Sequence, residues 1–253
     1  MTEPRQANID GLSCVSLLLE PSVNGLSLGR ATGFAISHNE RHYLVTNWHV
    51  LAGRNPDTGT PISPTGAVPD AVGITFHRSA QLGTWTARTV PVIDAEGKRL
   101  WMEHPAGREV DVVLLPLDPG PEVVVYPLDL ALARDDVAAA PSMPVAIIGF
   151  PLGLTGAGVL PIWKTGHIAS DPDIDYGGTP TFLIDATTRG GMSGSPVVLR
   201  FWGGYPRRDG SKTIGGSVTS FMGVYSGRIR DDVEVGKVWR PHLIAEILAG
   251  AGA

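Results

Sequence analysis

Short hydrophobic runs separated by turn-forming residues recur along almost the whole chain. The runs are rich in β-branched and aromatic side chains, whereas the 32 glycines and 21 prolines recur mainly between them. This pattern is typical of strands joined by turns, and it predicts an all-β fold. The segments that fit it are CVSLLLE, GRATGFAIS, RHYLVTN, VGITFH, TWTARTVPVI, VDVVLLPL, VAIIGF, WKTGHIAS, TFLIDA, SPVVLRF and FMGVYSG.

A helical pattern is clear only in the C-terminal segment PHLIAEILAG. Pro241 suits the first turn of a helix, and Gly250 suits its end. The apolar side chains between them fall on one stripe, which consists of Leu243, Ile244, Ile247 and Leu248. We therefore expect a short amphipathic helix that packs on the last strands.

The predicted strands divide into two sets. The weak break ARDDVAAAPSMP, at residues 133–144, separates them, and closing each set into a barrel would leave no strand edge exposed. The sequence therefore predicts two β-barrels, one formed by residues 1–130 and one by residues 131–253. A long loop rich in glycine, proline and threonine is expected at residues 53–70.

The composition is that of a globular chain, since 43% hydrophobic and 18% charged residues provide ample material for a core. With 20 basic against 25 acidic residues and no long basic run, we expect no nucleic-acid partner. No stretch approaches the roughly 18 apolar residues of a membrane span, and the first residues lack a signal-peptide pattern. Cys14 is the single cysteine, which excludes an internal disulfide. We expect a cytoplasmic protein without a membrane partner.

Candidate chemistry begins with a histidine and an aspartate, each at one end of an apolar run. His49 closes YLVTNWHVL, where a strand end would hold its ring at the rim of a packed scaffold. Asp111 opens DVVLLPL, and a carboxylate there is costly unless a donor such as an imidazole N–H bonds to it. Taken alone, either residue also fits a structural role.

A glycine-rich turn, RGGMSGSPVV, surrounds Ser193. Glycine accepts backbone angles that let N–H groups converge, so the N–H groups of Gly191 and Ser193 are candidates to bind an oxyanion. The chain order His49, Asp111, Ser193 is one of the known orders of serine-hydrolase triads. An α/β-hydrolase is disfavoured, because its G-x-S-x-G motif needs glycine where Ser195 stands.

These segments together resemble the trypsin-like serine peptidases, in the bacterial branch that includes HtrA-type proteases and glutamyl endopeptidases. The resemblance is carried, in the family's order, by GFAI, YLVTNWHVL, DVVLL, VAIIGFPLG, KTGHIAS, LIDATTRGGMSGSPV and FMGVYSG. It implies the chymotrypsin-like fold of two antiparallel six-stranded β-barrels, and a serine endopeptidase that needs no metal or organic cofactor. Its partners would be a protein or peptide substrate and, as a further candidate, a regulatory protein.

The resemblance also implies a role for each candidate side chain. Ser193 Oγ would attack the peptide carbonyl, His49 would take and return the proton, and Asp111 would orient the imidazole. Two alternatives stay open. One is a catalytically inactive binding module on the same fold, and the other is an esterase that uses the same three residues.

The family's primary specificity pocket receives the side chain that precedes the scissile bond. By resemblance, its lining here is Thr187, Thr188, Tyr225, Ser226, Gly227 and Arg228. Thr187 stands at the floor position, where an acid would favour Lys or Arg, so we expect no preference for basic side chains. Thr188 with Arg228 would accept an acidic side chain, whereas Tyr225 would fill the pocket and admit small apolar ones.

Three further residues near the candidate triad have expected roles. Ser226 resembles the family's serine whose hydroxyl supports the catalytic aspartate. In animal digestive relatives an aspartate precedes the nucleophile and pairs with a newly cut N-terminus, but Met192 stands there in this chain. That activation switch cannot operate, and Arg189 is a candidate to order the loop instead.

Overall fold

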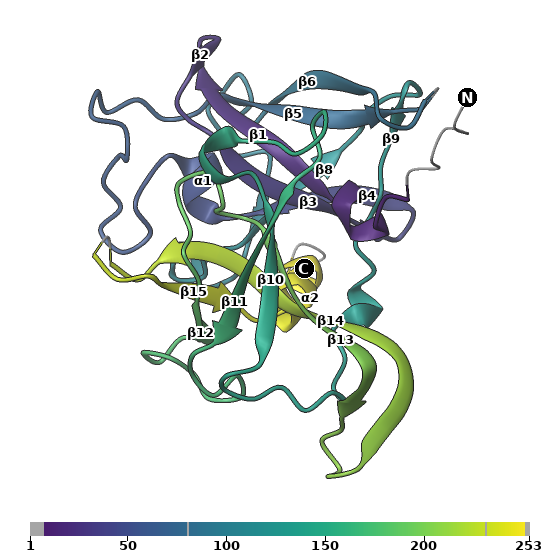
Figure 1. The fold of residues 1–253 in the computed structure, drawn as a ribbon. Helices are drawn as coiled ribbons and strands as arrows, with labels where there is room; N and C mark the ends of the chain where they lie inside the picture. The colour runs from purple at the N-terminus through teal and green to yellow at the C-terminus, as the bar shows by residue number, and fades with distance from the viewer. Residues whose placement is uncertain (1–7, 80, 231, 251–253) are drawn as a thin grey trace, which may run out of the picture.

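Two groups of antiparallel strands form the body of the protein, one above the other in the view of Figure 1. They are seen in a computed structural model that describes residues 8–79, 81–230 and 232–250. The first group comes from the N-terminal half of the chain and the second from the C-terminal half. The fold is thus mostly β, as the hydrophobic pattern predicted.

The N-terminal group is a nine-stranded sheet. Its main path runs in the order β6-β5-β1-β3-β4-β8-β7, while β2 pairs with β1 and β9 pairs with β5. The strands are β1 (Ser16–Val23), β2 (Leu26–Ser27), β3 (Ala31–His38), β4 (Arg41–Thr46), β5 (Ala71–Arg78), β6 (Trp85–Pro91), β7 (Met102–Glu103), β8 (Val113–Leu117) and β9 (Val123–Val124). Burial alternates along β5, as expected for a strand with one face on a core.

The C-terminal group closes into a six-stranded barrel, in the order β10-β11-β12-β15-β14-β13. The strands are β10 (Pro144–Gly149), β11 (Ile162–Ile168), β12 (Thr181–Asp185), β13 (Pro196–Pro206), β14 (Lys212–Arg228) and β15 (Val235–Trp239). The sequence pattern missed β15, whose short segment VGKVW is interrupted by glycine and lysine. This strand pairs with both β12 and β14 and therefore closes the barrel.

Only the C-terminal barrel agrees with the expected pair of closed six-stranded barrels. In the described N-terminal residues the hydrogen-bonded path ends at β6 on one side and at β7 on the other. The chain between them folds back on itself, because Leu100 N–H donates to Val92 O and the Asp94 side chain holds the turn. Between β6 and β7 the structure has only the isolated bridge of Ile93 with Arg99, so the group is an open sheet.

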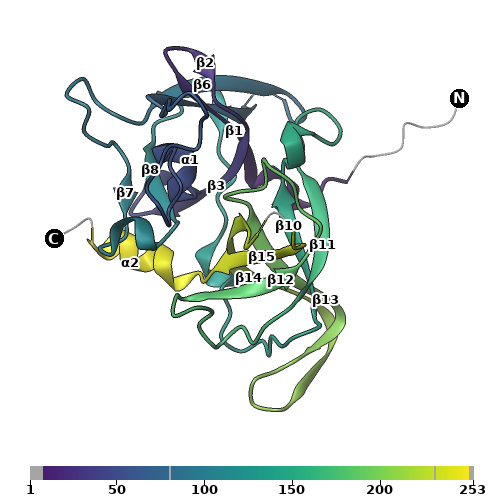
Figure 2. The ribbon, with the colours of Figure 1, turned by 90° about the vertical axis from the view of Figure 1, so that its left-hand side faces the viewer.

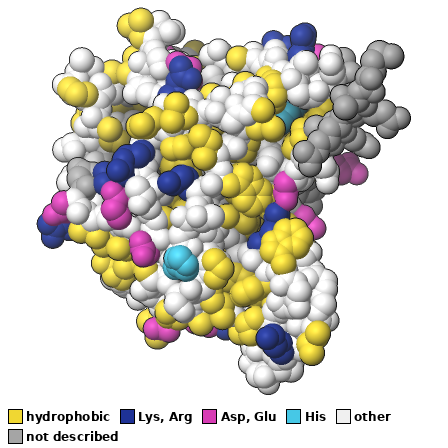
Figure 3. All heavy atoms as spheres, viewed as in Figure 1, with side chains coloured by type: hydrophobic (Ala, Val, Ile, Leu, Met, Phe, Trp, Pro, Cys, Tyr) yellow, Lys and Arg dark blue, Asp and Glu magenta, His cyan; other side chains and the backbone are white. Residues whose placement is uncertain are grey.

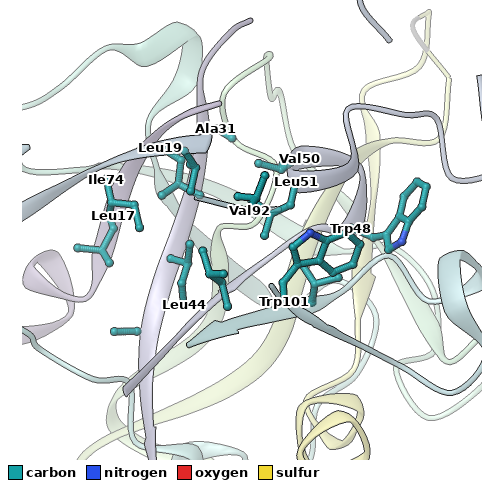
Figure 4. Close-up of a cluster of buried hydrophobic side chains, with 14 of the residues drawn as sticks. Leu17, Leu19, Ala31, Leu44, Trp48, Val50, Leu51, Ile74, Val92 and Trp101 are labelled. Atoms are coloured by element: carbon teal, nitrogen blue, oxygen red, sulfur yellow. The ribbon is translucent and has the colours of Figure 1, made fainter. Parts of the chain in front are cut away.

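Apolar side chains in the described residues form three buried clusters. One packs against the N-terminal sheet, and in it Trp48 and Trp101 pack edge to face (Figure 4). A second fills the barrel. The third, which we call the shared cluster, takes side chains from both groups, and the rings of Phe34 and Phe221 meet there with centroids 5.6 Å apart. The two halves of the chain therefore bury part of one core together.

The C-terminal helix α2 (His242–Gly250) lies against both groups of strands (Figure 2). Its buried side chains, Leu243, Ile244 and Ile247, are those of the predicted stripe and belong to the shared cluster. The helix packs on residues of the last strands, Phe221, Val224 and Trp239, through this cluster, and it also contacts β7 and β8 of the N-terminal sheet. Leu248, the fourth residue of the predicted stripe, is partly buried against the same cluster.

His49 does not close a strand, contrary to expectation. β4 ends at Thr46, and His49 lies in the short helix α1 (Trp48–Ala52). Gly53 ends this helix in the left-handed conformation, with φ of 60°. The turn buries Trp48 in the N-terminal core and leaves His49 at a cleft.

The other helices are single 3-10 turns. They are η1 (Gly11–Cys14), η2 (Gly107–Glu109), η3 (Leu130–Leu132) and η4 (Pro151–Gly153). In the part of the chain that the structure describes, no helix has the length and apolar character needed to cross a bilayer.

β13 and β14 continue beyond the barrel as a hairpin that projects at the lower right of Figures 1 and 3. The two strands stay paired as far as Pro206 and Lys212. Two large apolar side chains, Trp202 and Ile214, are exposed on this hairpin.

Candidate active site

Two hydrogen bonds join His49 to Asp111. His49 Nδ1 lies 2.7 Å from Asp111 Oδ2, and the backbone N–H of His49 donates to Asp111 Oδ1 at 2.9 Å. The aspartate is only 2% exposed. Among the described residues its carboxylate bonds to His49 alone, so the support expected from Ser226 is not seen. Because the carboxylate only accepts hydrogen bonds, the neutral imidazole carries its proton on Nδ1, and Nε2 is the nitrogen that can accept a proton.

The pairing of β4 with β8 brings these two residues together, although they are 62 positions apart in the chain. Thr46, at the end of β4, lies opposite Val113, at the start of β8. The residues just beyond these strand ends therefore meet at one edge of the sheet. Asn47 fixes the junction, because its Nδ2 donates to Asp111 O at 2.7 Å.

The surroundings of the imidazole favour its protonated form. Burial alone would lower the pKa of His49, but the charge of Asp111 and the hydrogen bond to it outweigh burial and raise the pKa above 6.5. The same carboxylate would stabilise the imidazolium that forms when Nε2 accepts a proton. The pair is therefore suited to general-base chemistry.

Ser193 comes from the barrel and lines the same cleft as His49. Its side chain is half-buried, and a Cβ atom placed on Gly227 would lie 4.0 Å from its Oγ. No hydrogen bond joins this hydroxyl to the imidazole in the described structure. The two groups thus share one cleft, and Gly227, which was expected to line the specificity pocket, lies beside the hydroxyl.

Thr32, at the start of β3, holds the loop that carries Ser193. Its N–H donates to Ser193 O at 2.9 Å, and its hydroxyl donates to Gly191 O at 2.7 Å. The same hydroxyl accepts from Phe150 N–H at 3.1 Å, and Thr32 O accepts from Thr46 Oγ1 at 2.8 Å. Since Thr32 is fully buried, water cannot replace these bonds. The sequence patterns did not indicate this residue, whose only signal was a threonine within the apolar segment ATGFAI.

The peptide between Gly190 and Gly191 is oriented by a bond to η4. Gly190 O accepts from Leu152 N–H at 2.6 Å. Because the C=O and N–H of a trans peptide point in opposite directions, this bond directs Gly191 N–H away from η4. Gly191 has φ of 93°, and a Cβ there would overlap Phe150 O, so glycine is required. Within the described residues neither Gly191 N–H nor Ser193 N–H has an acceptor. Both donors are therefore available to an oxyanion.

The predicted pocket residues separate into two groups. The residues that line the cleft beside the imidazole are Ser226, Gly227 and Arg228. Thr188 and Tyr225 are instead buried with their hydroxyls bonded to each other, and the tyrosine ring belongs to the barrel core. Burial raises the pKa of Tyr225, which keeps the phenol neutral. Thr187 is exposed but lines neither of the clefts at His49.

Arg189 and Met192 both anchor the loop that leads to Ser193. Arg189 donates to Glu234 Oε1 at 2.9 Å and to Thr188 O at 2.8 Å. This ion pair is about half exposed, so it stabilises the loop only modestly. Met192 is fully buried in the barrel core. Arg228 also lies 3.6 Å from Glu234 Oε1, which offsets the positive charge that an acidic substrate side chain would meet.

The closed barrel, the sheet packed on it and the cleft between them define a trypsin-like peptidase fold. The chain belongs to the trypsin-like peptidase family, since the family's trypsin-like peptidase domain matches residues 31–202. A comparison with curated protein sequences finds no match.

Solved structures of several proteases share this fold. The active form of the Rv3671c protease from M. tuberculosis has 20% identity and a TM-score of 0.53, over 96% of this chain and 82% of that chain. Protease Anisep from Arthrobacter nicotinovorans has 12% identity and a TM-score of 0.54, over 94% and 95%. The thermostable serine protease AL20 from an extremophilic microorganism has 14% identity and a TM-score of 0.53, over 96% and 100%. At these identities the likeness concerns the fold.

Proposed function

We propose that the protein is a serine endopeptidase. The observation that carries this proposal is the pair of hydrogen bonds from His49 to the buried Asp111, in a cleft that Ser193 also lines. Membership of a peptidase family implies protein substrates. The two N–H groups without acceptors supply the remaining part that acyl transfer needs.

In the proposed reaction, His49 Nε2 takes the proton of Ser193 Oγ while this oxygen attacks the carbonyl carbon of the substrate. Asp111 keeps the other imidazole proton on Nδ1 and stabilises the imidazolium. The N–H groups of Gly191 and Ser193 donate to the oxyanion, each contributing about 3 kcal/mol to the transition state. The C–N bond then breaks as the imidazolium protonates the leaving amine. Water attacks the acyl-enzyme by the same route and releases the carboxylate product.

Labelling by a fluorophosphonate probe tests whether the serine is activated. We expect rapid labelling of the wild-type protein, no labelling of Ser193→Ala and labelling slowed by a factor of about 10³ or more in His49→Ala. Ser217→Ala, which changes an exposed serine on the projecting hairpin, is the matched control and should label like the wild type. Equal labelling of all four proteins would contradict the proposal.

A peptide library then separates the endopeptidase from its two alternatives. Cleavage within peptides, lost in Ser193→Ala, is the expected result. Turnover of activated esters without cleavage of any peptide would identify an esterase. Neither labelling nor turnover would identify an inactive binding module.

A further inference from the structure

Two clefts meet at His49. One is lined by residues 226–228, which were expected to line the pocket for the side chain that precedes the scissile bond. The other has a volume of about 610 Å³ and is lined by both His49 and Ser193. It runs between the β1–β2 turn and the loop at residues 53–69, and we call it the apolar cleft.

The walls of the apolar cleft are largely hydrophobic. Apolar side chains line both walls: Val23, Leu26 and Leu28 on one, and Ile62, Pro64 and Ala67 on the other. Arg30 is the only Lys, Arg, Asp or Glu among its described lining residues, and it pairs with Glu20 at 3.4 Å. In Figure 3, apolar side chains reach the surface at the upper left, where Figure 1 places β2.

Backbone hydrogen bonds hold both walls in place. Leu28 N–H donates to Pro21 O at 2.8 Å, and Ile62 N–H donates to Gly53 O at 2.9 Å. Asp70 joins the two walls, because its N–H donates to Ser22 O at 3.0 Å and its Oδ2 accepts from Asn24 N–H at 2.8 Å. A cleft whose walls are already ordered binds a ligand without the entropy cost of ordering them.

One large apolar side chain on each wall of the apolar cleft is exposed to solvent. Leu26 is 71% exposed and Ile62 is 55% exposed, although both belong to well-bonded segments. Contiguous exposed apolar surface that continues into a polar reactive centre is typical of a binding site. The continuity with Ser193 points to the substrate itself as the occupant.

We propose that the apolar cleft binds the residues that follow the scissile bond and selects apolar side chains there. This inference rests on the proposed endopeptidase function. A substrate whose acyl part lies along residues 226–228 must pass Ser193 and continue into the second cleft. An extended chain rises about 3.3 Å per residue, so roughly three residues after the bond occupy the first 10 Å of it. The substrates are therefore extended segments with Leu, Val or Phe after the bond.

A peptide series with one acyl part tests the inference. Each of the three positions after the bond carries Leu, Gly, Asp or Lys in turn, and kcat/KM is measured by mass spectrometry. We expect Leu to exceed Gly and Asp by about tenfold or more at one position at least. Leu28→Asp should shift the preference at that position from Leu to Lys. Ile214→Asp places the same charge on the distant hairpin and should leave the wild-type preference unchanged.

The peptide series and the labelling experiment together distinguish failure of the cleft inference from failure of the proposed function. If Leu28→Asp does not fold, Leu26→Asp serves as the second variant, because Leu26 is already largely exposed. Peptide cleavage with no dependence on these positions, or with the same preference in the cleft variant, would overturn the inference and leave the endopeptidase function standing. Absence of both labelling at Ser193 and peptide cleavage would overturn the proposed function, and the inference with it. Labelling or ester turnover without cleavage of any peptide would also overturn both.

Discussion

At the scale of single residues, Thr32 is the side chain that most directly positions the proposed oxyanion donors. Thr32→Val keeps the shape but removes the hydroxyl, which leaves Gly191 O and Phe150 N–H without their partner. We expect kcat to fall about 10- to 100-fold with little change in KM, because the donors act on the transition state. Thr32→Ser should restore most of the activity.

Steady-state kinetics and thermal unfolding of the two Thr32 variants check this prediction. Leaving buried polar groups unpaired costs about 1–3 kcal/mol of unfolding free energy, so assays are run well below the melting temperature. A rise in KM at constant kcat would show that Thr32 does not act on the oxyanion donors.

The pKa of His49 determines the pH dependence of activity. The neutral imidazole is the base, so kcat/KM should fall with decreasing pH through a midpoint above 6.5. The pKa is raised on folding, so protonation favours the folded state. This contribution to stability is complete below about pH 6.5 and is lost as pH rises through the folded pKa.

An NMR titration of His49 in the Ser193→Ala protein measures this pKa without turnover. Asp111→Asn removes the neighbouring charge and should lower the midpoint. A midpoint at or below 6.5 in the protein that keeps Asp111 would show that Asp111 does not raise the pKa of His49.

The candidate triad could be predicted from the sequence because each member lies beside a local pattern, an apolar run or a glycine-rich turn. Thr32 could not, since its hydroxyl meets Gly191 across 159 positions of the chain. Tyr225 was assigned to the pocket by resemblance to the family, and its position in the chain does not show which way its ring points. In the structure the ring lies in the barrel core.

At the scale of elements, we expect the turn that carries Ser193 to accept a side chain at Gly190 but not at Gly194. Gly194 has φ of 85°, and a Cβ there would overlap Thr32 O and Thr46 Oγ1. We expect Gly194→Ala to lower the unfolding free energy by about 2 kcal/mol or more and to abolish most activity. Gly190→Ala is the matched control, because its Cβ would meet no heavy atom within 4 Å.

Denaturant unfolding and fluorophosphonate labelling of the two glycine variants test this difference. Gly190→Ala should stay within about 0.5 kcal/mol of the wild type. Equal effects of the two substitutions would mean that neither φ nor the approach of Thr32 constrains the turn.

The longer strands and the C-terminal helix could be predicted, because their apolar positions repeat with a clear period. β2, β7 and β9 have two residues each and carry no such period. The segment around His49 was predicted as a strand, but it forms a short helix. Trp48 is buried on this helix, and Gly53 ends it in the left-handed conformation. Whether a sheet closes depends on contacts between its distant edges, which local patterns do not contain.

At the scale of the whole molecule, the candidate site is assembled from both groups of strands. His49 and Asp111 come from the N-terminal sheet and Ser193 comes from the barrel, and the bonds of Thr32 connect the two. The relative position of the groups therefore determines the geometry of the site. The proposed boundary near residue 130 stays a prediction, and the shared cluster suggests how to test whether the parts fold separately.

Ile244 in α2 is fully buried in the shared cluster, so its truncation weakens both groups at once. We expect Ile244→Ala to lower the unfolding free energy by about 2–5 kcal/mol, while far-UV circular dichroism and tryptophan fluorescence still report one transition. Ala249→Ser, on the exposed side of the same helix, should change stability by less than about 1 kcal/mol. Two separate transitions in the Ile244 variant would show that the sheet and the barrel fold independently. A single transition means that the shared core couples them, and then any substitution that loosens this core also lowers the fraction of molecules with an assembled site.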